Sequence, residues 1–157
     1  MAYQQGDTIQ ASDYNTFAGN VNTIIGTGSN DSGYGLSEIA TINAGDTITA
    51  AQWNSLLSGL QKAANHQGTT LTNASNTVSQ GGNILPLSNL EADITLITNN
   101  KLTADASNMA TDTGVTSTRT TSWTATVQHV FTVTFANANA ARFFFNSGGE
   151  IRFAGSR

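Results

Sequence analysis

A segment of twelve residues occurs twice in this chain, and the duplication constrains the fold more than any other sequence feature. Residues 6–17 return 39 positions later as residues 45–56, and six of the twelve positions are identical. Where the copies differ, Tyr14 corresponds to Trp53, so a large aromatic residue is kept. Two copies are fewer than the three or more repeats that a solenoid needs. We therefore expect a duplicated supersecondary unit whose two copies pack on each other.

Each copy predicts an extended approach followed by an amphipathic helix. In the second copy, Thr49 and Gln52 have the spacing of a capping box, and Gly68 suits a left-handed helix end. The first copy has Gln10 in place of the capping threonine, and Gly26 ends its helix. Apolar residues recur at helical spacing in both copies. The two stripes are Trp53, Leu56, Leu57, Leu60 and Ala64 in the second copy, and Tyr14, Phe17, Val21, Ile24 and Ile25 in the first.

A third apolar stripe follows Pro86 and predicts a helix within residues 86–112. Ser88 with Glu91 repeats the capping-box pattern. The stripe has spacings of 3, 4 and 3, like the a and d positions of a coiled coil, so this helix could be a stalk shared among several chains. The polar, low-complexity residues 69–85 before it predict a linker. The stripe consists of Leu87, Leu90, Ile94 and Ile97.

The hydrophobic period changes from about 3.6 to 2 after residue 112, which predicts strands. Apolar residues alternate with mostly polar ones from Trp123 to Phe135, residues 142–146 predict a second strand, and residues 150–154 a third. Ser147-Gly148-Gly149 would form the hairpin turn. The predicted fold class is therefore α+β, with a C-terminal antiparallel sheet. The predicted organisation is a duplicated unit in 1–68, a linker in 69–85, a helix in 86–112 and a β region in 113–157.

Composition and charge exclude several classes of function. Charged residues make up 10% of the chain, against the roughly 25% of ordinary domains. Six basic residues and a net charge of −4 cannot build a binding stripe for a nucleic-acid backbone. The chain has no cysteine and no apolar run of membrane-spanning length. We therefore expect no nucleic-acid partner and no membrane insertion, and the weakly charged surface favours association between molecules.

The residues that usually carry catalysis form no recognisable arrangement. His66 and His129 lack a nearby histidine or carboxylate partner in sequence, no serine occupies a nucleophile elbow, and the ten carboxylates show no obvious pairing. We predict no enzyme activity, no catalytic residue, no metal site and no cofactor. Tyr34, in the glycine-rich residues 28–35, is the one aromatic that looks exposed. It is interpreted either as a receptor contact or as an anchor of its loop.

The segment from Ala141 to Phe153, which contains RFFFNSGGEIRF, resembles a segment of virion structural proteins of tailed bacteriophages, particularly those of cyanobacteria and other aquatic hosts. Residues 45–54 with the closing residues 66–68 are similar to the front half of such proteins. Together these matches cover about half of the chain and leave its middle unmatched. The resemblance implies a component of a phage tail, baseplate or tail fibre, located in the virion and assembled in several copies without enzymatic activity.

Three functions follow as expectations. The first is a structural virion protein that associates with copies of itself, as a trimer by analogy with tail fibres, and with other virion proteins. The second is a glycan-binding module of a tail fibre or adhesin that attaches to a host surface glycan through Tyr34 and the threonine-rich face of the predicted sheet. The third, and least supported, is a glycan-degrading enzyme. The residues expected to make assembly contacts are Leu87, Leu90, Ile94, Ile97, Phe143, Phe144, Phe145 and Phe153.

Overall fold

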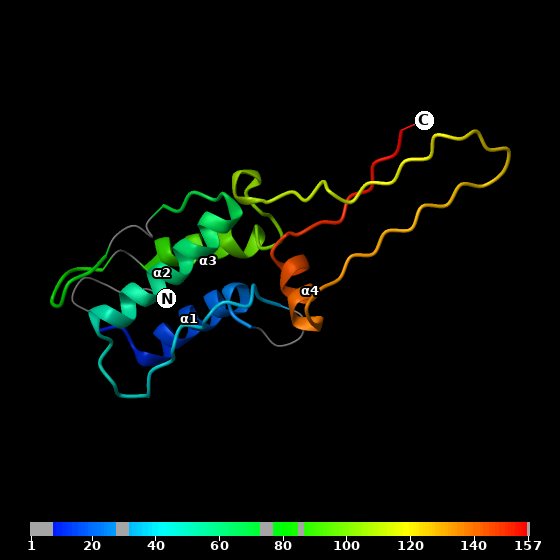
Figure 1. The fold of residues 1–157 in the computed structure, drawn as a ribbon. Coiled ribbons are helices and arrows are strands. Elements are labelled where there is room, and N and C mark those ends of the chain that lie inside the picture. The colour runs from blue at the N-terminus through cyan, green and yellow to red at the C-terminus, as the bar shows by residue number, and fades with distance from the viewer. Residues whose placement is uncertain (1–7, 28–31, 73–76, 85–86, 157) are drawn as a thin grey trace.

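The protein is described by a computed structural model that covers residues 8–27, 32–72, 77–84 and 87–156 (Figure 1). Three helices pack side by side into a bundle, and a fourth lies at one end of it. The four are α1 (Ala11–Ile25), α2 (Ala50–Gln67), α3 (Leu87–Asn99) and α4 (Ala138–Asn146), with one 3-10 turn, η1 (Ala106–Asn108). No helix within these described ranges is both long and apolar enough to cross a membrane.

The predicted ends of the duplicated helices are confirmed. Thr49 and Gln52 form the capping box: the backbone N–H of Gln52 donates to Thr49 Oγ1 at 3.2 Å, and the backbone N–H of Thr49 donates to Gln52 Oε1 at 2.8 Å. Gly68 ends α2 with a φ of 66°, in the left-handed region that glycine adopts without strain. Helix α1 begins after Gln10, whose side chain makes no capping bond, and ends at Gly26.

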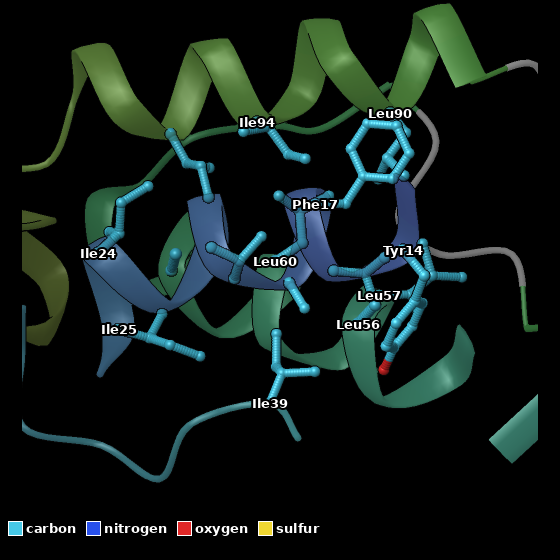
Figure 2. Close-up of a cluster of buried hydrophobic side chains, with 14 of the residues drawn as sticks. Tyr14, Phe17, Ile24, Ile25, Ile39, Leu56, Leu57, Leu60, Leu90 and Ile94 are labelled. Carbon is cyan, nitrogen blue, oxygen red and sulfur yellow. The ribbon is translucent and has the colours of Figure 1, made fainter. Parts of the chain in front are cut away.

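The apolar stripes of α1, α2 and α3 meet in one core, which Figure 2 shows in close-up. Every residue of the three predicted stripes is less than a tenth exposed, and the two repeated helices contact each other as expected. The hydroxyl of Tyr14 also donates a hydrogen bond to the carbonyl oxygen of Gln52 at 3.1 Å, which ties the first copy to the start of the second. The duplication has therefore produced two helices that bury each other.

The asparagine shared by the two copies has the same structural role in both. Asn15 donates from Nδ2 to the carbonyl oxygen of Ile42 at 2.9 Å, and its Oδ1 accepts from the backbone N–H of Ile42 at 2.9 Å. Asn54 makes the same two bonds to Val78, at 3.0 and 2.9 Å. One amide side chain on a helix thus satisfies both backbone groups of one residue in the extended segment that follows that helix. We call this pair of bonds the asparagine clamp.

A further clamp on α1 holds the same extended segment. Asn22 makes the paired bonds to Ile39 at 2.9 and 2.8 Å, two helical turns after Asn15. The side chain of Ile39 enters the core (Figure 2). It lies there beside Gly59 of α2. A Cβ atom on Gly59 would lie only 2.7 Å from the Cδ1 atom of Ile39. Glycine within a helix costs about 1 kcal/mol relative to alanine, and here it makes room for the clamped segment.

The predicted C-terminal sheet is wrong: the described part of the chain contains four helices and no strand, so the protein is mainly helical and not α+β. Residues 142–146, expected as a strand, form the second half of α4. Asn137 caps this helix, because its Oδ1 accepts from the backbone N–H of Ala140 at 2.9 Å. Alanines in the first turn then favour helix over strand. Asparagine is common both in turns and at helix N-caps, so Asn137 by itself does not distinguish a turn from a helix start.

The predicted hairpin turn is also wrong, since Ser147-Gly148-Gly149 ends α4. Gly148 has a φ of 85°, and its backbone N–H donates to the carbonyl oxygen of Phe145 at 3.1 Å. The N–H of Gly149 donates to the carbonyl oxygen of Phe144 at 2.8 Å. These two bonds are the Schellman pattern of a helix C-terminus. A left-handed glycine suits a tight hairpin and a helix end equally well, which explains the misinterpretation.

Residues 126–135 and 150–154 are extended, as their alternation predicts, but they are not strands, and the chain bends at residues 124–125 (Figure 1). In the described part of the chain, no backbone-to-backbone hydrogen bond joins either segment to a neighbour. Alternation of β-branched and polar residues favours extended local conformation, whereas a strand also requires a partner. His129 is exposed, and its Nδ1 lies 2.6 Å from Ser117 Oγ.

The third helix begins at Leu87, so Ser88, expected as its N-cap, lies inside the first turn. Pro86 lies outside the described residues, as do residues 28–31 of the glycine-rich loop and residues 6–7 of the first repeat copy.

The asparagine clamp generates a stability prediction. In Asn54→Ala, the N–H and C=O of Val78 lose their partners, so we expect the free energy of unfolding in urea to fall by about 1–3 kcal/mol. Asn20→Ala is the matched control, because Asn20 is an exposed residue of α1 and gains the same helix propensity on substitution. Equal stabilities of the two variants would show that the clamp contributes nothing.

Candidate functional site

The uncovered apolar side chains of this protein gather in its C-terminal third. Thirteen large hydrophobic residues are exposed in the described ranges, and ten of them lie at or after Met109. The extremes are Val130, 76% exposed, and Phe153, 80% exposed. The bundle contributes only Leu36, Leu96 and Leu102. The bundle is therefore complete as a packed unit, while the C-terminal part leaves its apolar surface open.

We call residues 110–136 the arm and residues 149–156 the tail. The arm leaves the bundle after η1 and returns to α4 (Figure 1). Figure 1 shows it projecting well away from the helices, with the tail leaving toward the same side. The contact between His129 and Ser117 joins its two limbs, and the chain bends between them at residues 121 and 124–125. The arm is thus the most exposed part of the described chain.

An aromatic cluster forms the root of the arm. The ring of Phe135, at the end of the returning limb, lies 5.3 Å from that of Phe144 and 5.8 Å from that of Phe145. Phe144 and Phe145 meet edge to face at 5.2 Å. Ring separations of this size favour aromatic attraction. Because Phe144 and Phe145 remain exposed, the cluster is only partly covered.

Helix α4 is fixed to the end of the bundle by polar contacts. Arg142 Nη2 donates to the carbonyl oxygen of Thr27 at 3.0 Å, and Asn146 Nδ2 donates to that of Gly33 at 3.1 Å. His66, in the last turn of α2, donates from Nε2 to the carbonyl oxygen of Ser147 at 2.7 Å, since a carbonyl can only accept. The arm therefore projects from a positioned base.

Tyr34 anchors its loop to the helices. Its hydroxyl donates to the carbonyl oxygen of Lys101 at 2.7 Å and accepts from Gln67 Nε2 at 2.8 Å. Its ring lies 4.8 Å from that of His66. Gln67 Nε2 also donates to the carbonyl oxygen of Ile97 at 2.9 Å, which links the ends of α2 and α3. The hydroxyl group of Tyr34 is thus already bonded within the chain.

The cavity beside Tyr34 is small, about 40 Å³. This is room for two or three water molecules, far below the roughly 300 Å³ of small-molecule sites. In the ranges that the structure describes, no three histidine, aspartate or glutamate side chains gather as potential metal ligands. Neither observation indicates a small-molecule or metal site in these ranges.

The eight expected assembly residues differ in burial. All four of the α3 stripe lie in the core of their own chain, and their exposed fraction is 5% or less. Phe143 is half-buried against Gly35, whereas Phe144, Phe145 and Phe153 are exposed. Sequence reasoning did not identify the asparagine clamps. The conserved identity of Asn15 and Asn54 between the two copies was the signal that could have found them.

Comparison with protein-family models, with curated proteins and with solved structures gives no match.

The packing of α4 against Gly35 leads to a second prediction. Gly35 has a φ of +81°, and a Cβ there would lie 2.6 Å from the ring of Phe143. We expect Gly35→Ala to loosen α4, so that trypsin cleaves after Arg142 several-fold faster than in the wild type. Gly45→Ala is the control, because Gly45 has a similar φ of +90° and open space around it. If both variants are cleaved at the same rate, the contact with Phe143 does not hold the helix.

The environment of Tyr34 generates a third prediction. Burial raises the pKa of its phenol above the usual value, and the hydrogen bond from Gln67 lowers it to a smaller extent. The folded protein therefore holds this proton more tightly than the unfolded chain, and the associated stability is lost as the pH rises above about 10. We expect the melting temperature of Tyr34→Phe to fall less steeply than that of the wild type in this range. Parallel pH profiles would contradict the assignment.

Proposed function

We propose that this protein is a structural subunit that acts by associating with copies of itself through its C-terminal part, as a component of a phage tail, baseplate or tail fibre. The observation that carries self-association is the placement of exposed apolar side chains. The bundle has a closed core, and most of the uncovered hydrophobic residues belong to the arm, α4 and the tail.

Exposed apolar surface on this scale needs a physical explanation. Monomeric proteins rarely expose contiguous apolar patches larger than a few hundred Å². Full burial of one large aliphatic or aromatic side chain contributes about 1.5–3 kcal/mol. Burial of a few of the exposed side chains of each copy, such as Val130 and Phe153, is therefore enough to drive association.

The low charge of the chain supports the same proposal. Only 10% of residues are charged, so repulsion between copies is weak. The place in a phage particle rests on the resemblance of residues 141–153 and of the N-terminal repeat to virion proteins. No observation favours the glycan-binding alternative, because the hydroxyl of Tyr34 is bonded to Lys101 and Gln67.

Immunogold labelling of particles of the phage that encodes this chain tests the proposed place, and sedimentation of the purified chain tests association. We expect label on the tail or its base, and a weight-average mass that rises with concentration. A monodisperse monomer at high concentration would contradict self-association. Label confined to the capsid would contradict the place in the particle. Binding on a glycan array that Tyr34→Phe abolishes would favour the receptor module instead.

A further inference from the structure

We propose that copies of this protein associate arm to arm, with the apolar face of one arm packed against that of another. This inference rests on the proposed function, because it names the surface through which the copies would assemble. It is carried by the conformation of the arm, by the distribution of its side chains and by its charge.

A single copy leaves the arm uncovered. No backbone-to-backbone hydrogen bond joins residues 113–136 to any other described residue, and the side-chain bond between His129 and Ser117 is what links the two limbs. Five large apolar side chains of the arm are exposed. They are Val115, Trp123, Val130, Phe131 and Val133.

At residues 131–134, the returning limb has an apolar side and a hydroxyl side. Successive side chains of an extended chain point to opposite sides. Phe131 and Val133 occupy odd positions, while Val130, Thr132 and Thr134 occupy even positions. Packing of the odd-numbered faces would bury Phe131 and Val133 and leave Thr132 and Thr134 in water. This arrangement fits a partner of the same kind, which also has an apolar face to cover.

The charge of the arm favours another arm over a bundle as its partner. The arm contains Asp112 and Arg119 and is neutral overall. The tail contains one acidic and one basic residue, Glu150 and Arg152, and is also neutral; Glu150 Oε2 accepts from Arg152 Nε at 2.6 Å. Residues 1–109 carry eight acidic residues and two lysines, a net charge of −6. Two bundles in contact would repel each other, and a neutral arm has no excess positive charge to attract an acidic bundle. Two neutral arms meet without this penalty.

The position of the arm permits the contact. Both of its ends are held by the folded body, at η1 and at α4, while its middle projects away from the helices (Figure 1). Two copies can therefore bring their arms together without collision of the bundles. An interface between identical surfaces of this kind is the isologous type found in two-fold symmetric assemblies.

The test uses the full chain with two charged variants on the apolar face of the arm, Phe131→Asp with Val133→Asp, and Phe131→Lys with Val133→Lys. Each variant alone brings like charges together, so we expect the dissociation constant in sedimentation experiments at low salt to rise by at least about tenfold. An equal mixture of the two variants pairs opposite charges, so association should recover.

Leu96→Asp and Leu96→Lys are the matched controls, because Leu96 of α3 is 36% exposed and Phe131 is 38% exposed. These controls should associate like the wild type, and circular dichroism should show unchanged helix content in all variants. A wild-type chain that stays monomeric at every concentration would contradict the proposed function itself. Association that survives the arm variants, that is lost in the Leu96 variants, or that is not restored by mixing would overturn the arm-to-arm contact and leave self-association standing.

Discussion

The fold depends on an amide side chain that satisfies both backbone groups of an extended residue. An extended segment without a strand partner cannot normally pack against a bundle, because its N–H and C=O groups would be buried without hydrogen bonds. Asn15 and Asn22 remove this penalty at Ile42 and Ile39, and the loop can then place Ile39 in the core. Asn54 does the same after the second helix.

The clamped loop also connects the bundle to the C-terminal part of the chain. It contains Tyr34, which is bonded to the end of the bundle, and Gly35, against which Phe143 of α4 packs. Helix α4 in turn holds the root of the arm through Phe144 and Phe145. The repeated unit therefore does more than form a core. Its loop contacts α4, and α4 contacts the base of the projecting arm.

The helical half was predictable from the sequence because its signals are local. The capping box at Thr49 and the glycine at position 68 fix the ends of α2 by bonds within a few residues. The C-terminal half was mispredicted because period-2 alternation reports only local conformation, whereas a strand depends on a partner. The α3 stripe was ambiguous for a similar reason, because its pattern does not specify which surface covers it. Leu90 and Ile97 would form the same pattern whether they packed on their own chain, as they do, or on a neighbour.

A complete bundle with an uncovered, neutral arm is the arrangement expected of a subunit that assembles through the arm. Native-state hydrogen exchange measured at low and high protein concentration tests this most directly. The account predicts that amides of α1, α2 and α3 are protected at both concentrations. It predicts that amides of residues 110–136 exchange freely in dilute solution and become protected when copies associate. Protection of the arm in the dilute monomer, or free exchange of the arm in the associated protein, would contradict it.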